Sequence, residues 1–257
     1  MLRFRSLGSG SGGNSTLVEA CGLLPFRILI DCGLGIRQLA LRLAESGLQP
    51  EDINAIFITH EHGDHIGCAR SLALRHRIPV WMSHGTHSGI GAPDFDGLLH
   101  TARDGKAIDL GGLQIMPFTV PHDAREPLQL SCTDGSAKLG ILTDLGHATP
   151  HVMAHLQACD ALLLESNHDT QLLNQSVYPP FLKRRVGGDY GHLSNAAAAD
   201  IACAVTHGGL KHLVAAHLSA QNNRPDLVQV VLSDALGCNS SDIVVAGASS
   251  GTPWLQI

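Results

Sequence analysis

The stretch Thr59-His60-Glu61-His62-Gly63-Asp64-His65 places three histidines and two acids in six consecutive positions. It directly follows the apolar, strand-like run Ile53–Ile58 and leads into an apolar pattern of helical spacing over His65–His76. Four side chains that commonly bind metal ions therefore leave the end of one predicted strand together.

The spacing within this stretch suits two metal ions rather than one. At the tip of a strand, alternate side chains such as His60 and His62 project to the same side. The turn into the following helix can direct Asp64 and His65 at a second point nearby. The alternative is a polar turn of solvated histidines or a pH-sensitive surface cluster, and the density of ligands disfavours both.

The regions on either side of this stretch alternate between strand and helix patterns. The N-terminal half contains further strand patterns at Phe26–Asp31 and Pro79–Met82 and a helix pattern at Ile36–Glu45. The middle is richer in strands, which are predicted at Leu113–Val120, Leu128–Thr133 and Lys138–Thr143, with a turn at Asp134-Gly135. The C-terminal half predicts strands at Asp160–Glu165, Leu210–Ala216 and Asp242–Ala246 and helices at Pro179–Arg185, Ser194–Thr206 and Pro225–Leu236.

This order of elements predicts an α/β fold. No low-complexity linker and no clear repeat divides the chain, so we expect one domain over residues 1–257. The apolar runs are far shorter than the roughly 20 residues that cross a bilayer, and the N-terminus lacks the features of a secretory signal. We therefore expect no membrane span and a cytoplasmic location.

Composition narrows the function further. The seven cysteines are scattered without a C-x-x-C pair, which predicts reduced thiols and neither a disulfide framework nor a cysteine zinc site. The net charge of −6 argues against a broad basic surface for nucleic acid, so any such contact must be local. The sixteen histidines, against two Tyr and two Trp, instead favour a transition-metal site.

The stretch at residues 60–65 resembles the H-x-H-x-D-H motif of the metallo-β-lactamase superfamily. The resemblance implies a four-layer αββα sandwich. It also implies one motif residue at the end of an earlier strand and three at the ends of later strands. The chain has a matching residue for each in the expected order: Asp31, His122, Asp144 and His217.

By this resemblance, two divalent metal ions share one site. Its ligand sets would be His60, His62 and His122 for the first ion and Asp64, His65 and His217 for the second, with Asp144 bridging. Asp31 would hydrogen-bond a metal-bound histidine from behind, although alone it reads as an ordinary strand-ending Asp.

The chemistry of such a pair of ions is hydrolytic. Two cations about 3.5–4 Å apart lower the pKa of a shared water, so that hydroxide is available as the nucleophile at neutral pH. Asp64 would also orient the attacking oxygen, which makes it a candidate catalytic residue. Zinc is the expected metal for a site rich in nitrogen ligands, and manganese is the alternative because carboxylates contribute.

Three further stretches resemble the YycJ-like branch of the superfamily: Ser9–Asn14, Glu165–Asp169 and Gly191–Asn195. Members of that branch are regarded as 5′-to-3′ exonucleases, so the resemblance implies a phosphodiesterase that acts on DNA. A small-molecule hydrolase of a thioester, lactone or cyclic phosphodiester is the alternative on the same metals. A metal-binding protein without catalysis is disfavoured by the complete ligand set.

Candidate substrate contacts follow from the same stretches. The glycine-rich loop ending in Asn14 can present N–H groups to an anion, or it is only a flexible hairpin. His192 is the candidate for contacting the scissile phosphate or protonating the leaving oxygen, and Ser194 for binding phosphate at a helix N-terminus; the alternative is a loop residue and a helix cap.

The basic cluster Lys183-Arg184-Arg185 could grip a nucleic-acid backbone or form a solvated helix face. The histidines without a motif context are interpreted as surface or core residues: His76, His84, His87, His100, His151, His155 and His212.

Overall fold

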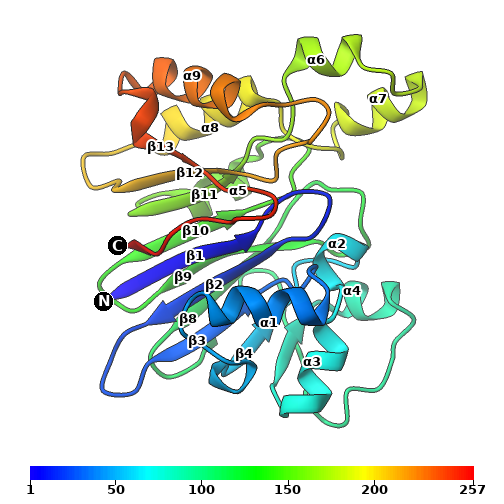
Figure 1. Cartoon of the computed structure of the whole chain (residues 1–257), viewed down its shortest axis with the longest axis vertical. Helices are drawn as coiled ribbons and strands as arrows, with labels where there is room; N and C mark the ends of the chain where they lie inside the picture. Colours follow the sequence, from blue (N-terminus) through cyan, green and yellow to red (C-terminus); the bar gives the residue numbers. More distant parts are fainter.

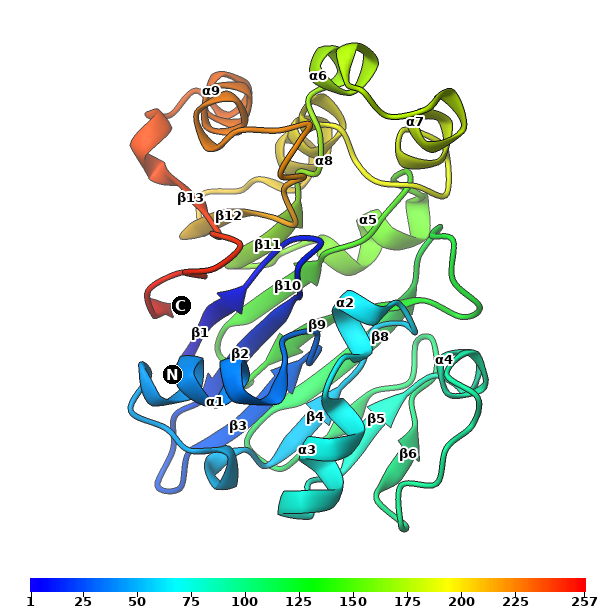
Figure 2. The same ribbon diagram turned by 45° about the vertical axis from the view of Figure 1, so that its right-hand side comes forward.

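Two seven-stranded β-sheets pack face to face in the computed structural model, which describes residues 1–257 (Figures 1 and 2). The first sheet has the strand order β14 (Leu255–Gln256), β1 (Leu2–Gly8), β2 (Ser15–Ala20), β3 (Phe26–Ile30), β4 (Ala55–Phe57), β5 (Val80–Met82) and β6 (Leu99–Thr101). The second has the order β13 (Ile243–Val245), β12 (His212–Ala216), β11 (Ala161–Glu165), β10 (Lys138–Leu142), β9 (Leu128–Thr133), β8 (Gln114–Thr119) and β7 (Ile108–Asp109).

Helices cover both outer faces of this pair of sheets. On the side of the first sheet lie α1 (Ile36–Ala44), α2 (Gly63–Ile66), α3 (Ala69–His76) and α4 (His84–Gly89). On the side of the second lie α5 (Pro150–Leu156), α8 (Asn195–Val205) and α9 (Pro225–Leu236), while α6 (Thr170–Gln175) and α7 (Pro180–Val186) project beyond them (Figure 2). Single 3₁₀ turns occur at Pro50–Asp52 and Ser240–Asp242. The predicted αββα sandwich is confirmed.

The central strands are apolar on both sides because each sheet has two buried faces. In β3, Ile28 and Ile30 point into the core between the sheets, whereas Leu29 packs against the helices of the first sheet. In β11, Leu163 joins the core between the sheets, and Leu162 packs against the helices of the second. Alternate side chains of one strand thus serve two cores, and this explains the continuous apolar runs in the sequence.

The direction of the strands decides where the functional residues gather. Strands β3 to β6 are mutually parallel, and so are β10 to β13. Strand β8 is antiparallel to β9, which is antiparallel to β10, so β8 runs with that second set. The carboxyl ends of all these strands lie along one edge of the sandwich, where the chain turns into loops.

Two predicted elements differ in the structure. Strand β4 covers only Ala55–Phe57 of the predicted strand, and the single helix predicted over His65–His76 is divided into α2 and α3. The division occurs at Gly67, whose backbone has a φ of 26° and packs against Cys32 and Gly33 so closely that a Cβ atom would clash. The spacing of apolar residues in the sequence cannot predict such a close approach between two backbone segments. No helix of the structure combines the length and apolar character that crossing a bilayer requires.

Candidate metal centre

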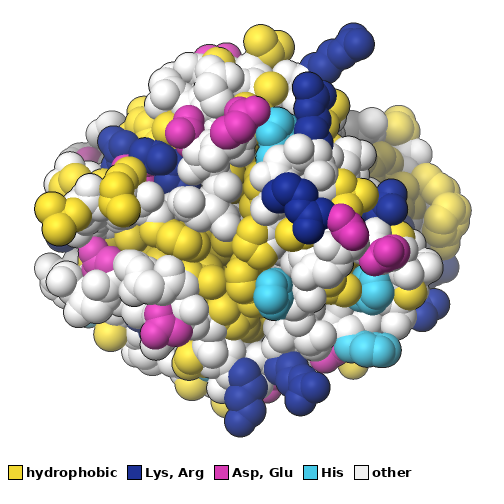
Figure 3. Space-filling model, turned by 90° about the horizontal axis from the view of Figure 1, so that it is seen from below, with side chains coloured by type: hydrophobic (Ala, Val, Ile, Leu, Met, Phe, Trp, Pro, Cys, Tyr) yellow, Lys and Arg dark blue, Asp and Glu magenta, His cyan; other side chains and the backbone are white.

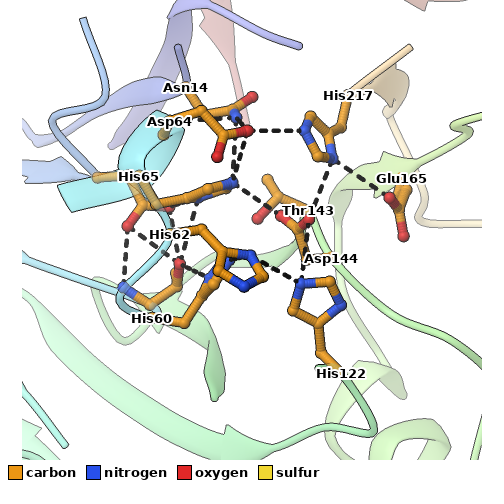
Figure 4. Close-up of polar contacts among 12 residues, drawn as sticks. Asn14, His60, His62, Asp64, His65, His122, Thr143, Asp144, Glu165 and His217 are labelled. Carbon is orange, nitrogen blue, oxygen red and sulfur yellow. Dashed lines mark hydrogen bonds and ion pairs between the residues drawn. The ribbon is translucent and has the colours of Figure 1, made fainter. Parts of the chain in front are cut away.

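The seven predicted metal ligands converge at the edge of the sandwich where the parallel strands end (Figure 4). His60, His62, Asp64 and His65 come from the loop after β4 and from α2, as the first motif predicts. The other three follow strands of the second sheet: His122 after β8, Asp144 after β10 and His217 after β12. The two sheets therefore each supply part of one site.

The first group of ligands consists of three histidine rings. His60 Nε2 lies 3.1 Å from His62 Nδ1, and His122 Nε2 lies 3.4 Å from the same His62 nitrogen. Each of the three side chains thus turns one ring nitrogen toward a common point. The remaining nitrogen of His60 contacts Thr59 Oγ1 at 2.9 Å, and that of His122 contacts the Gly191 carbonyl oxygen at 3.0 Å.

The second group lies beside the first and contains carboxylates. Asp64 Oδ2 is 3.7 Å from His65 Nε2 and 3.5 Å from His217 Nε2. Asp144 lies between the two groups, with Oδ2 3.0 Å from His65 Nε2 and Oδ1 3.7 Å from His122 Nε2. Oδ1 also lies 3.3 Å from His217 Nδ1, so this carboxylate is close to rings of both groups.

The donors at this point suit metal ions better than they suit one another. Ring nitrogens face each other at 3.1–3.4 Å, where a hydrogen bond would need one of two rings to carry its proton inward. Asp144 Oδ2 is buried and has no hydrogen-bond donor in acceptable geometry, although His65 Nε2 is close. A buried carboxylate oxygen needs a positive charge beside it, which a bound metal ion or a protonated His65 ring supplies. The arrangement of five histidines and two aspartates can hold divalent cations at two adjacent points.

Asp31 holds one of these rings from behind. Its Oδ2 accepts from His65 Nδ1 at 2.8 Å, which leaves Nε2 of that ring facing the site. The same carboxylate accepts from the backbone N–H of Thr59 at 2.9 Å and from the Thr59 hydroxyl. Such a partner fixes the tautomer and orientation of a metal-binding histidine.

Backbone strain marks two residues of the site. Asp31 and His217 have φ angles of 63° and 54°, in the left-handed region that is unfavourable for residues with a Cβ atom. Neighbouring groups hold the backbone of His217: its N–H donates to Ser9 Oγ at 2.7 Å, and its carbonyl accepts from Asn167 Nδ2 at 2.9 Å. The glycine-rich N-terminal loop therefore helps to fix this histidine.

Burial and the carboxylates of Asp144 and Asp31 set the protonation of the histidines in the site. Burial lowers the pKa of His60 and His122, so these rings are neutral and ready to donate a lone pair. Burial also acts on His65, but the carboxylates of Asp144 and Asp31 prevail and raise its pKa to about 10. The pKa of His217 is likewise raised despite burial, chiefly by Asp144. Metal binding must therefore displace protons from these two rings.

A buried acid that the sequence analysis did not assign to the site lies beside these ligands. Glu165, at the end of β11, accepts from His192 Nδ1 at 2.7 Å, and its Oε1 lies 3.2 Å from His217 Nδ1. Its second oxygen accepts from the backbone N–H groups of Leu145 and Leu193. Although burial favours the protonated acid, His192 and His217 lower the pKa of Glu165. The signal that could have found it is its place as a charged residue ending an apolar parallel strand.

The predicted substrate residues divide into those at the cavity and those away from it. A cavity of about 330 Å³ opens over the centre and is lined by Asp64, Asp144, His192 and Arg185 among others. Asn14 is buried behind it, where its amide contacts the backbone oxygen and side chain of Asp64 and the His65 ring.

The other predicted substrate residues lie outside this cavity. Ser194 caps α8 by accepting from the Ala197 N–H. Lys183 donates to the Asn174 carbonyl, and Arg184 is exposed on α7. Ser194 therefore caps a helix, which was the alternative to phosphate binding in the sequence analysis. Asn14 holds Asp64 and His65 in position.

Side chains of both charges are mixed on the face seen from below (Figure 3). The basic side chains form no continuous surface there. This distribution fits the net charge of −6.

Comparison with known proteins identifies the family. A family model described as a β-lactamase superfamily domain matches residues 26–218, which include every proposed metal ligand. The chain belongs to the metallo-β-lactamase superfamily. This member of the superfamily is 31% identical over 240 residues to a Bacillus anthracis protein named exodeoxyribonuclease YycJ, over 91% of this chain and 89% of that protein. It is 30% identical over 239 residues to the protein named exodeoxyribonuclease WalJ of Streptococcus pneumoniae, over 91% of this chain and 88% of that protein.

A solved structure confirms the metallo-β-lactamase fold. The metallo-β-lactamase fold protein YhfI from Bacillus subtilis superposes with a TM-score of 0.76 at 15% identity, over 100% of both chains. The resemblance to the YycJ-like branch is thus confirmed by the sequence relatives. Like other members of this metallo-β-lactamase branch, the chain is a metal-dependent hydrolase.

Proposed function

We propose that this hydrolase is a dinuclear phosphodiesterase that degrades DNA from the 5′ end. The observation that carries the proposal is the bridging position of Asp144 between two groups of ligands, with His192 beside it on the wall of the same cavity. The relatives named exodeoxyribonuclease support DNA as the substrate.

The ligand geometry favours two ions in the assignment that the motifs imply. His60, His62 and His122 would hold the first ion. Asp64, His65 and His217 would hold the second ion. Asp144 would contact both ions. When bound, two such cations make hydroxide available from water at neutral pH and offset negative charge that develops on the phosphate. We propose zinc because nitrogen donors predominate, and manganese is the alternative to compare.

The residues around the ligands supply the remaining chemistry. Glu165 holds Nδ1 of His192, so Nε2 is the ring atom available to give a proton to the leaving oxygen. Burial favours the neutral ring, but Glu165 and Asp144 raise the pKa of His192, which keeps an acid available there. Asp64 lines the cavity and can orient the attacking water, and Arg185 can contact a phosphate oxygen at the same cavity.

The test uses metal-loaded protein and DNA strands labelled at either the 5′ or the 3′ end, with Zn²⁺ and Mn²⁺ compared. We expect 5′-labelled strands to release mononucleotides at once, and 3′-labelled strands to shorten step by step. Loss of products after chelation and recovery on re-addition of metal show that the activity depends on metal. Absence of cleavage with either metal, in protein that hydrolyses a thioester or lactone, would contradict the proposal and favour a small-molecule hydrolase.

A further inference from the structure

A second cavity of about 240 Å³ lies next to the cavity over the metal centre. The two share Arg185, which extends from α7 and forms an ion pair with Asp123 at 2.6 Å. The second cavity is lined further by Arg184 and by the loop Gly188–Gly191. A strand of several nucleotides that begins at the metal centre would pass Arg185 to reach this second cavity.

Aromatic side chains occur along this path and are scarce elsewhere on the surface. The chain has only two tyrosines, and Tyr178 lines the first cavity while Tyr190 lines the second. Tyr190 is 63% exposed, and Tyr178 is partly exposed. Burial stabilises aromatic rings, so the exposure of Tyr190 beside the metal centre indicates a binding surface.

The charges along the second cavity nearly cancel. Arg184 has no ion-pair partner, but Arg185 is paired with Asp123, and Asp189 adds another carboxylate. In a chain with a net charge of −6, attraction to phosphates is therefore weak. A strand bound here needs contacts to its bases, and aromatic faces provide them.

The loop that carries Tyr190 is held in place by its neighbours. His147 Nδ1 lies 2.8 Å from the Asp189 carbonyl oxygen, and the Gly191 carbonyl oxygen contacts the ring of the proposed ligand His122. Gly191 also packs against the carbonyl groups at the end of α7, where a Cβ atom would clash. The backbone that carries Tyr190 is thus fixed close to the metal centre, so little backbone entropy is lost when a ligand binds there.

We propose that Tyr178 and Tyr190 stack on successive bases of an unpaired strand whose end lies at the metal centre, while Arg184 and Arg185 contact its phosphates. The inference rests on the proposed phosphodiesterase function and specifies its substrate as single-stranded nucleic acid. Base pairing would hide the base faces from both rings, so a blunt duplex would be a poor ligand until its end opens.

The experiment measures binding of metal-loaded protein to a strand with phosphorothioate linkages, which resist hydrolysis, and a 3′ fluorophore. Fluorescence anisotropy is compared for three ligands: the single strand, the same strand with abasic sites at its first nucleotides, and a blunt duplex. Wild-type protein is expected to bind the complete single strand most tightly. Tyr190→Ala is expected to weaken that binding about 5-fold to 150-fold and to reduce the preference for the complete over the abasic strand, because only Tyr178 remains to stack on a base. Tyr190→Trp should restore the preference for bases.

Leu41→Ala, which removes an exposed apolar side chain from α1 on the other side of the sandwich, is the matched control and should bind as the wild type does. Equal affinity of the wild type for complete and abasic strands, or tighter binding of the duplex, would overturn the inference. Hydrolysis of bis(p-nitrophenyl) phosphate, measured in parallel, reports on the proposed function separately. Its absence together with base-dependent strand binding would reject the phosphodiesterase and leave the stacking surface standing.

Discussion

Asp144→Asn is expected to lower kcat for strand degradation by about 10³-fold or more, because the substitution removes the one carboxylate that faces both groups of ligands. In the wild type, burial disfavours the charged form of Asp144, but the His217 and His65 rings hold its pKa well below the usual range. An amide of the same shape keeps the packing and loses that charge. We therefore expect less metal in the purified variant, measured by mass spectrometry, together with the loss of activity.

The control for this substitution is Asp234→Asn, which changes an exposed carboxylate on α9 and should leave metal content and activity unchanged. Thermal unfolding of both variants separates loss of the site from loss of the fold. An Asp144→Asn protein that is folded, binds two ions and degrades DNA at the wild-type rate would exclude a bridging role for this carboxylate.

His192→Ala is expected to lower kcat by about 10²-fold to 10⁴-fold while the metal content stays at the wild-type value, because this ring is proposed to protonate the leaving oxygen. The leaving alkoxide of DNA needs that proton. The p-nitrophenolate of bis(p-nitrophenyl) phosphate is a stable anion and needs it far less. The loss of activity should therefore be large on DNA and small on the aryl ester.

Two further variants sharpen this comparison. Glu165→Gln should lower the activity on DNA less than His192→Ala does, since Glu165 positions the ring and does not touch the substrate. Its metal content is measured alongside, because Glu165 also contacts His217. His100→Ala, which removes an exposed ring that stacks on Trp81, is the matched control without an effect on either substrate. Equal losses on both substrates for His192→Ala would show that the ring supports the metals or the fold and is no proton donor.

The sequence predicted which side chains gather at one edge of the sandwich, because the family's motif residues each stand at a strand end. His122, Asp144 and His217 each follow an apolar run, and parallel strands bring such ends to one edge of a sheet. The site residues could thus be found without knowing how far each strand extends. The length of β4 was overestimated because Ile53 and Ile58 are apolar and buried but lie outside the strand.

The features that the sequence did not predict depend on contacts between distant segments. Nothing in the local sequence shows whether the Asn14 amide faces a substrate or contacts Asp64. Glu165 resembles any acid after a strand until the fold brings it to His192. The proposed role of Tyr178 and Tyr190 depends on their places in two cavities that both include Arg185, and the sequence does not predict these cavities. Such residues act through tertiary neighbours, and periodicity describes only local structure.

The central claim is that the activity resides in two metal ions held by one set of strand-end residues, and a metal titration tests it most directly. Protein stripped by a chelator is supplied with Zn²⁺ or Mn²⁺ in increasing molar amounts, and degradation of a 5′-labelled strand is measured at each step. We predict negligible activity without metal and a rise that ends at two equivalents per chain. Full activity in the stripped protein, or strand degradation that does not respond to added metal, would contradict the account.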